Sequence, residues 1–455
     1  MTAIGINTAA PKGAKADWLN DWAPEDAQFW RNTGKSIAWR TLTITTANLT
    51  MAFIVWFAVS ALVVRLPALG FRLTTSELFW LAAMPGLAGG TLRIIHTFLI
   101  PMYGTRRVVS LSTLSLLIPA IGWFYAVQDP TMPFWILMVL AFLAGLGGGN
   151  FSSFMPSTSL FFPKRLQGTA LAIQAGVGNF GVSVVQFVTP WIIGFALVGT
   201  LLGESQSMRL PSGQVVPIWL QNATAIYVPF IVVFGIAAWF MLKSVPVRAN
   251  FREQLDILRE KHGFYMTVLY IMTFGSFSGL SATFPLLIKQ VYGALPGAPD
   301  PLTYAFLGPL VGSVARILAG PLSDRVGGAR VTHWSGIGML LCALAVTLFT
   351  SPTSMDEFPY FIWAMLGLFF FAGVGNASTF KQMPMIFPPR QAGGIIGWTG
   401  AMAAYGPFTC GMMFAAAFGW FNSPDPFFYV AAVFYLACIV INWWYYARKG
   451  AEKPC

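Results

Sequence analysis

The segment Leu87-Ala-Gly89-Gly-Thr-Leu-Arg93-Ile94 returns later in the chain as Leu310-Val-Gly312-Ser-Val-Ala-Arg316-Ile317. The same offset of 223 residues pairs Gly104 with Gly327 and Arg107 with Arg330. A second repeat relates Ala144-Gly145-x-Gly147, followed by Pro156, to Ala372-Gly373-x-Gly375, followed by Pro384. A repeat on this scale predicts two structurally equivalent halves.

Both copies lie in long apolar stretches. Apolar residues make up 56% of the 455 residues and charged residues only 9%, too little charge to cover a soluble protein of this size. A helix of about 20 apolar residues spans a bilayer. We therefore predict an all-α membrane protein with twelve transmembrane helices in two pseudo-symmetric six-helix halves. The predicted spans lie near residues 41–64, 76–101, 108–127, 133–160, 167–201, 223–243, 264–290, 302–322, 331–350, 358–383, 392–420 and 426–447.

The spans divide the chain into two halves and three polar segments. The segment 202–222 is predicted to be an exposed loop after a long fifth helix. The N-terminal tail is polar, so no cleaved signal peptide is expected. Its Trp18, Trp22 and Trp30 are expected to lie along the lipid headgroups. The predicted units are a tail at 1–40, a first half at 41–243, a linker at 244–262, a second half at 263–447 and a tail at 448–455.

The net charge of +11 indicates orientation and not nucleic-acid binding, because the basic residues sit in short loops on one side of the predicted spans. This asymmetry predicts a multi-pass protein of the cytoplasmic (inner) membrane, surrounded by lipid, with both termini in the cytoplasm. The basic residues on the predicted cytoplasmic side are Arg106, Arg107, Lys164, Arg165, Lys243, Arg248, Arg252, Arg259, Lys261, Arg325, Arg330, Arg390, Arg448 and Lys449.

The sequence offers no pattern for catalysis. We find no nucleophile paired with a base and no phosphate-binding loop. The four cysteines have neither metal-ligand spacing nor the pattern of a disulfide framework. We therefore expect a protein that is not an enzyme and needs no metal or cofactor. The cysteines are Cys342, Cys410, Cys438 and Cys455.

Three basic residues remain inside the predicted spans: Arg93, Arg316 and Lys381, with no Asp or Glu beside them. A charge in hydrocarbon costs at least a few kcal/mol, so such residues usually serve a function. Buried charges are normally paired, which suggests an anion from outside the chain. Because Arg93 and Arg316 are equivalent in the repeat, they are expected to face one central cavity. The alternative is that each side chain snorkels to the membrane surface.

The segment Gly320-Pro-Leu-Ser-Asp324-Arg325-x-Gly327-x-x-Arg330 resembles the cytoplasmic loop motif of the major facilitator superfamily. That resemblance implies that Asp324, Arg325 and Arg330 form a latch which holds one conformation. The first-half copy, Pro101-Met-Tyr-Gly104-Thr-Arg-Arg107, lacks the acidic residue.

Three glycine-rich runs resemble the signatures of the nitrate/nitrite porter family within that superfamily. They begin at Gly147-Gly-Gly-Asn150-Phe151, at Gly176-Val-Gly178-Asn179-Phe180 and at Gly373-Val-Gly375-Asn376, and Leu269-Tyr270-Ile-Met-Thr-Phe274 matches as well. The resemblance implies nitrate and nitrite as substrates. It also implies that Arg93 and Arg316 clamp the anion, Asn179 and Tyr270 donate hydrogen bonds, and Phe151, Phe274 and Phe53 form apolar walls.

The glycines of these runs are expected to let helices approach and slide. They are Gly147, Gly148, Gly149, Gly176, Gly178, Gly373 and Gly375. Lys381 lies toward the inner end of its span, where it either attracts anions leaving to the cytoplasm or snorkels.

A secondary active transporter that works by alternating access, functional as a monomer, fits these features. Two arginines that approach in a medium of low dielectric repel each other, and a bound anion would offset the repulsion. We therefore expect obligatory exchange of nitrate for nitrite. Proton–nitrate symport is the alternative, with His96 as the titrating group, although a lone membrane histidine more often serves packing or hydrogen bonding. An organic-phosphate exchanger, a channel and a receptor fit less well.

Overall fold

The computed structural model describes residues 17–200, 202–209, 214–246 and 259–455. The expectations for residues 1–16, and for most of the linker 244–262, lie outside the described residues. Within them, twelve helical segments are long and apolar enough to span a membrane, as predicted. They are Ala27–Leu62, Thr75–Tyr103, Thr105–Ala126, Phe134–Phe161, Lys164–Ile192, Asn222–Met241, Lys261–Tyr292, Leu302–Val326, Gly328–Thr347, Met355–Ile386, Gly394–Phe421 and Asp425–Ala447.

Several spans consist of more than one helical element. In the first half the elements are α1 (Ala27–Phe29), a π-helical turn (Trp30–Gly34), α2 (Lys35–Leu62), a 3₁₀ turn (Leu66–Leu69), α3 (Thr75–Tyr103), α4 (Thr105–Leu114), α5 (Leu117–Ala126), α6 (Phe134–Ala144), α7 (Leu146–Gly149), α8 (Phe151–Phe161), α9 (Lys164–Ile192), α10 (Asn222–Ala225) and α11 (Val228–Met241). Three short strands, β1 (Leu197–Thr200), β2 (Gln206–Arg209) and β3 (Val215–Ile218), lie between α9 and α10.

The second half repeats this scheme without strands in its described residues. Its elements are α13 (Lys261–Tyr270), a π-helical segment (Ile271–Gly275), α14 (Ser276–Tyr292), α15 (Leu302–Ala305), α16 (Leu307–Val326), α17 (Gly328–Thr347), a 3₁₀ turn (Met355–Glu357), α18 (Phe358–Ile386), α19 (Pro389–Ala403), α20 (Gly406–Phe421), α21 (Asp425–Asn442) and a π-helical turn (Trp443–Ala447).

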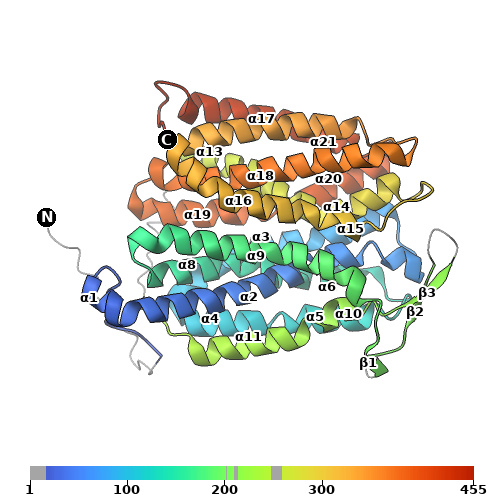
Figure 1. Cartoon of the computed structure of the whole chain (residues 1–455), viewed down its shortest axis with the longest axis horizontal. Helices are drawn as coiled ribbons and strands as arrows, with labels where there is room; N and C mark the ends of the chain where they lie inside the picture. Colours follow the sequence, from blue (N-terminus) through green and yellow to red (C-terminus); the bar gives the residue numbers. More distant parts are fainter. Residues whose placement is uncertain (1–16, 201, 210–213, 247–258) are drawn as a thin grey trace.

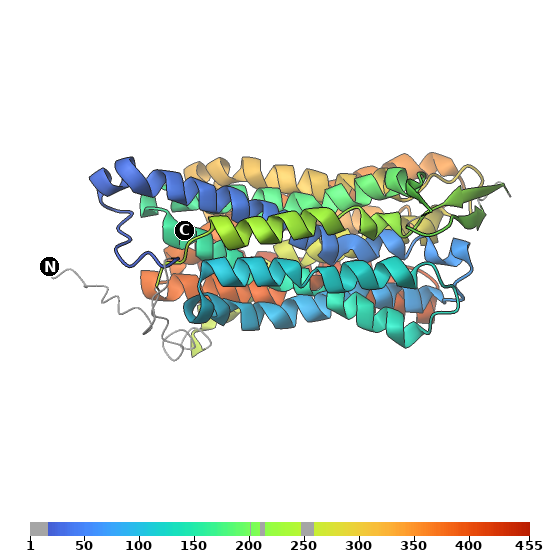
Figure 2. The same ribbon diagram turned by 90° about the horizontal axis from the view of Figure 1, so that it is seen from below.

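The long helices run side by side, with the first half below and the second half above in Figure 1. Helix α1 and the C-terminus lie at one end of the bundle and the β2–β3 hairpin at the other, and Figure 2 shows the same separation. We refer to these as the terminus end and the hairpin end. The halves meet along α3 with α20, α9 with α16, and α2 with α14.

The sequence repeat corresponds to equivalent local structure. Gly104 and Gly327 have φ angles of 78° and 101°, and each ends one helix and begins the next. Glycine adopts such left-handed angles without steric cost, which explains its presence at both turns. Each half therefore has the same sharp connection after its second helix.

The second repeat is equally visible in the packing. A Cβ at Gly145 would lie 2.9 Å from the backbone nitrogen of Gly89, and a Cβ at Gly373 would lie 2.9 Å from the Cα of Gly312. The same pair of helices is thus pressed together backbone to backbone in both halves.

Two expectations about the polar segments are wrong. The fifth helix ends at Ile192 and not near 201, and β2 pairs with β3 inside the segment expected to be a loop. Trp219 N donates to the Ile193 carbonyl at 2.7 Å, which turns the chain back toward the bundle. An apolar run such as 192–202 has the same hydropathy in a helix or a strand, so composition could not place this boundary.

The tryptophans of the tail lie against the first half of the protein. The Trp18 ring packs on Gly104, Trp22 Nε1 donates to the Leu160 carbonyl at 3.1 Å, and Trp30 is 5% exposed beside Phe162. The rings find apolar partners at the terminus end of the first half, and these contacts remove apolar surface from water. Their expected position along the lipid headgroups stays a prediction. The first helical segment begins at Ala27, capped by Asp26.

Candidate functional site

Arg93 lies in α3 and is fully buried. Its Nε donates to the carbonyl oxygen of Gly148 at 2.9 Å, and its Nη1 donates to that of Gly400 at 2.7 Å. Gly148 belongs to the first half and Gly400 to the second, so one side chain connects both halves. The bare backbone of Gly148 makes room for α3, because a Cβ there would lie 2.7 Å from the Cα of Gly89.

Two phenylalanines from different halves face each other beside Arg93. The ring centroids of Phe151 and Phe274 are 6.4 Å apart with 26° between the ring planes. The guanidinium carbon of Arg93 lies 4.6 Å from the first centroid and 5.2 Å from the second, which places it at the edge of the gap. A flat ion between two rings needs about 7 Å, twice a normal contact distance of about 3.5 Å. The centroid separation is slightly smaller than this distance, so the two rings would move apart slightly to hold one flat ion.

Phe274 is part of the π-helical segment Ile271–Gly275. Such wide turns are rare, and they occur frequently at functional sites because they re-aim side chains. Tyr270 precedes this segment and stacks on Phe274, with centroids 5.6 Å apart at 11°. Tyr270, at the end of α13, and Phe274, in the π-helical segment, thus form one aromatic column.

Arg316 approaches the same column from α16. Its guanidinium carbon lies 5.4 Å from the ring centroid of Phe380, and that ring packs on Tyr270 at 5.4 Å. Tyr270 interacts electrostatically with both Arg93 and Arg316. The two arginines therefore share one buried environment, as their repeat equivalence suggested, and neither reaches the membrane surface.

Four buried groups at this site lack hydrogen-bond partners among the described residues. They are Arg93 Nη2, Arg316 Nη1, the Tyr270 hydroxyl and the side-chain amide of Asn179, although the Tyr270 hydroxyl lies near enough to the Arg316 guanidinium for the two groups to interact. Within the same part of the chain, neither arginine forms an ion pair with a carboxylate. Buried donors without partners are costly, so this arrangement calls for a ligand that accepts hydrogen bonds and carries negative charge.

Phe53 and Trp56 form the outer wall behind Phe151. Phe53 is 6.4 Å from Phe151 and packs on Trp56, and the guanidinium carbon of Arg93 lies 5.4 Å from the Trp56 ring. Sequence reasoning named Phe53 but missed Trp56, Phe380 and the Gly400 carbonyl. Aromatic residues are frequent in every span, and a backbone carbonyl has no sequence signature, so no signal distinguished them.

The glycines named from the sequence lie where helices touch. A Cβ at Gly147 would lie 2.1 Å from the Ala52 carbonyl oxygen, and one at Gly373 would lie 2.1 Å from that of Gly312. Gly176 faces Ile317 across the two halves at 2.8 Å. That these contacts slide during transport stays a prediction. The remaining members contact Gly89 and Trp56 (Gly148), His96 and Leu92 (Gly149), Leu49 (Gly178), and Ser335 and Thr273 (Gly375).

His96 follows Arg93 by about one turn of α3. Its Nδ1 lies 3.0 Å from the Ser153 hydroxyl, and its ring packs on Gly149. The histidine is therefore engaged with α8 of its own half, an arrangement that serves packing and hydrogen bonding.

The expectation that Lys381 lacks a protein carboxylate is wrong. Its Nζ lies 2.5 Å from Asp324 Oδ1 in the loop motif, and the two side chains are 41% and 60% exposed. α16 and α18 pack side by side, which brings the end of one helix within reach of a lysine on the other. An exposed pair of this kind contributes at most about 1 kcal/mol.

The first-half loop obtains a carboxylate from another part of the chain. Asp17 is buried, and its Oδ2 lies 3.6 Å from Arg106 Nη1. Ser244 N donates to the Asp17 carbonyl at 2.8 Å, and the Arg106 guanidinium lies 5.1 Å from the Trp239 ring. The tail thus connects the α3–α4 turn to the end of α11. Motif comparison alone could not reveal this contact, because Asp17 is remote in sequence.

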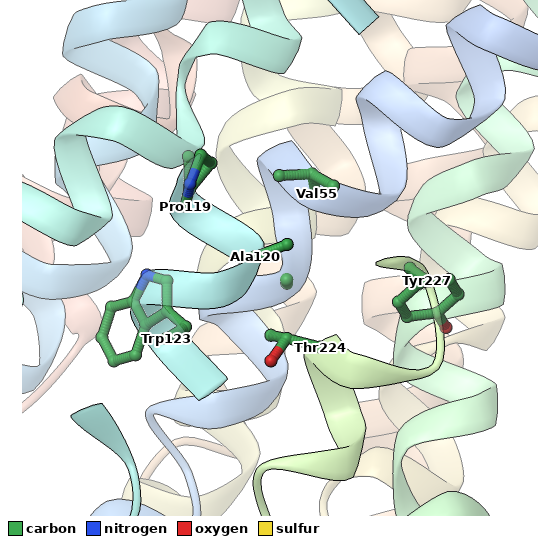
Figure 3. Close-up of a pocket in the computed structure, with 8 residues that line it drawn as sticks. Val55, Pro119, Ala120, Trp123, Thr224 and Tyr227 are labelled. Carbon is green, nitrogen blue, oxygen red and sulfur yellow. The ribbon is translucent and has the colours of Figure 1, made fainter. Parts of the chain in front are cut away.

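A separate small cavity lies within the first half (Figure 3). Val55, Pro119 and Trp123 contribute to its lining, which is largely apolar. None of the predicted anion-binding residues lines this cavity, so it is distinct from the arginine site. The full lining is Val55, Ala58, Pro119, Ala120, Trp123, Ala144, Thr224 and Tyr227.

Two six-helix halves that enclose an arginine pair without acidic partners define a membrane transporter for an anion. The family model of the Major Facilitator Superfamily matches residues 45–383. The chain is 65% identical over 447 residues to a probable nitrate/nitrite antiporter, NarK2, of Thermus thermophilus, which covers 98% of this chain and 100% of the relative. It is 37% identical over 455 residues to the nitrate/nitrite transporter NarU of Escherichia coli K12, covering 95% and 96%.

Among solved structures, the chain is similar in fold to an inward-facing bacterial homologue of the human lysosomal transporter Spinster. The TM-score is 0.63 at 15% identity, and the match covers 90% of this chain and 95% of the other. The chain belongs to the Major Facilitator Superfamily and, within it, to the nitrate/nitrite porter family. Proteins of this kind are transporters and not enzymes.

Proposed function

We propose that this protein exchanges nitrate for nitrite across the membrane by alternating access. The observation that carries the proposal is the pair of facing rings of Phe151 and Phe274, with Arg93, whose Nη2 has no hydrogen-bond partner among the described residues, beside both rings. Nitrate and nitrite are flat, singly charged oxyanions, and their oxygens accept hydrogen bonds from a guanidinium fork. The relatives, a probable nitrate/nitrite antiporter and a nitrate/nitrite transporter, agree with this assignment.

The charge balance favours exchange over net uptake. Two guanidinium groups without carboxylate partners repel each other when the site closes empty. A bound anion removes this penalty, so the loaded carrier changes conformation more readily than the empty one. The return step then requires a second anion, which gives obligatory one-for-one exchange with no net charge movement.

Proton–nitrate symport is the second candidate, and His96 is the group it would need. That histidine already shares a hydrogen bond with Ser153. The site itself holds groups that stay protonated near neutral pH, since arginine and tyrosine titrate far above it. Antiport therefore explains the site with fewer assumptions.

An organic-phosphate exchanger fits the gap poorly. A phosphate ester is tetrahedral at phosphorus and thicker than a flat ion, so Phe151 and Phe274 would have to move much farther apart to hold it.

We propose that the protein acts in the inner membrane, as a monomer, with its terminus end in the cytoplasm. Support for this orientation comes from the basic loops, which follow the positive-inside rule.

The test is counterflow in proteoliposomes that hold purified protein. Vesicles loaded with nitrite should take up labelled nitrate, whereas vesicles loaded with a non-transported anion should take up little. Uptake should not depend on an imposed pH gradient. Substantial nitrate uptake into vesicles without internal nitrite or nitrate would contradict obligatory exchange.

A further inference from the structure

Three buried polar residues form a layer between the two halves on the hairpin side of the arginine site. Gln186 of α9 donates from Nε2 to the Ser60 hydroxyl of α2 at 3.0 Å and to the Ser281 carbonyl of α14 at 2.8 Å. All three residues are almost completely buried. The bond to Ser60 stays within the first half, and the bond to Ser281 crosses to the second.

The position of this layer follows from the helix register. Ser60, Gln186 and Ser281 each follow by seven residues a group of the arginine site: Phe53, Asn179 and Phe274. The three helices run in the same direction, toward the hairpin end (Figure 1). Seven residues correspond to two helical turns, or about 10.5 Å. The layer therefore lies about two turns beyond the site, on the way to the hairpin end.

Further contacts between the halves lie beyond this layer. Arg65 forms an ion pair with Asp300, Lys289 Nζ donates to the Val64 carbonyl, and Thr75 Oγ1 donates to Gln290 Oε1 at 3.3 Å. Closer to the site, Thr91 and Tyr405 share a hydrogen bond of 2.9 Å. Among the described residues, these hydrogen bonds between the halves all lie at the level of Arg93 or on its hairpin side.

We propose that the Gln186–Ser60–Ser281 layer is a gate that separates the arginine site from the hairpin side of the membrane. The halves can open toward that side only if Gln186 releases the Ser281 carbonyl. The inference rests on the proposed transport function, because it assigns this glutamine a role in the same exchange cycle.

The polar character of the layer suits the passage of an anion. Asn179, Ser183 and Gln186 occupy positions i, i+4 and i+7 of α9 and therefore share one face. The hydroxyl of Ser183 is buried and has no hydrogen-bond partner among the described residues. An opened glutamine offers its N–H groups to water or to the anion, whereas an apolar plug would leave the ion without partners.

The test measures how readily a reagent from the hairpin side reaches the face of α9 between the proposed gate and the arginine site. In a background with the native cysteines replaced by serine, Ser183→Cys is labelled with a membrane-impermeant thiol reagent from the hairpin side. Gln186→Met keeps the length of the side chain but removes both hydrogen bonds. The loss of one bond between the halves should raise the labelling rate about three- to tenfold.

Two further variants keep the test decisive. Gln174→Met alters a buried glutamine of the same helix whose hydrogen bond to the Phe154 carbonyl stays within the first half. Ser60→Ala removes the bond within the first half and keeps the bond across the halves. Both should change the labelling rate by less than about twofold.

Equal labelling in Gln186→Met and in the parent would overturn the gate, as would an equal rise in Gln174→Met. Labelling does not require nitrate, so it is independent of the substrate assignment. If labelling rises as expected while nitrate counterflow is absent from the parent protein, the gate stands and the proposed function fails. If counterflow is normal and labelling does not respond, the gate fails alone.

Discussion

Arg93 donates a hydrogen bond from Nη1 to the carbonyl oxygen of Gly400 across the two halves, at 2.7 Å. The donor is the first of the two repeated arginines, and the acceptor is a backbone atom of α19. A hydrogen bond to a charged donor contributes about 1.5–3 kcal/mol. An anion that binds at the other nitrogen of the same guanidinium therefore acts on a group that already joins the halves.

Replacing Arg93 by lysine should abolish most of the exchange although the charge is kept. Lysine cannot bond Gly148, Gly400 and an anion in the same fixed geometry. The loss of one charge-assisted bond to the anion, about 1.5–3 kcal/mol, corresponds to a reduction of about 10- to 100-fold in the exchange rate. The exchange rate is measured with labelled nitrate in proteoliposomes. Arg72→Lys, at an exposed position, is the control and should exchange normally.

The parallel faces of Phe151 and Phe274 should determine the preference for flat anions. Phe151→Leu keeps an apolar side chain but removes one flat wall. We expect chlorate, which is pyramidal, to compete with nitrate roughly tenfold better in this variant than in the parent, since two facing rings disfavour an ion that is thicker than nitrate. Competition in the exchange assay tests this. The lipid-facing variant Phe142→Leu serves as control, and an unchanged chlorate preference in Phe151→Leu would refute the flat-wall explanation.

His96→Gln should retain exchange within about threefold of the parent, because glutamine can also bond the Ser153 hydroxyl. The response to a pH gradient should stay flat in both proteins. The assay compares nitrate uptake with and without an acid exterior. Uptake that is driven by the pH gradient in the parent and loses this drive in His96→Gln would favour symport.

The contact between Asp17 and Arg106 should hold the N-terminal tail against the first half. Because Arg106 is partly exposed, the pair contributes about 1 kcal/mol. Asp17→Asn should therefore increase the fraction of released tail about fivefold. Limited trypsin cleavage near Arg31 reports this release. Asp21→Asn, at an exposed position nearby, should cleave like the parent, and Arg106→Gln should match Asp17→Asn.

The C-terminal tail, residues 448–455, should dock less tightly against α13 in acid. The Lys261 ammonium, hydrogen-bonded to the Glu452 carboxylate, and His262 beside it hold the pKa of that carboxyl below its usual value. A pKa lowered in the docked state means that docking is favoured above the ordinary value, near 4.5, and is lost as the pH falls through the lowered value.

Cys455 gives a readout for this docking. Its Sγ lies 3.7 Å from Gln382 Oε1, and burial raises the pKa of its thiol to about 12, so the docked thiol reacts slowly. With a disulfide reagent that remains reactive in acid, Glu452→Gln should label faster than the parent at pH 7. The two rates should converge as the pH falls below the lowered pKa. A constant ratio between them at every pH would show that Glu452 does not control docking.

The sequence by itself determined the twelve spans, the two equivalent halves and the identity of the critical charges. These features are local or periodic: a span is an average over about 20 residues, and a charge in such a span is costly wherever the helix packs.

Only the tertiary structure decided which partners those residues have. The Gly400 carbonyl, the Ser281 carbonyl and the carboxylates of Asp17 and Asp324 meet their partners through the packing of helices that are distant in sequence. A hydrogen bond to a backbone carbonyl does not depend on the identity of the accepting residue. Mean hydropathy carries no information about the direction in which a side chain points. The sequence therefore indicated a pair of arginines without acidic partners. The facing rings of Phe151 and Phe274, and the proposed gate two helical turns away, could be found only from the three-dimensional arrangement.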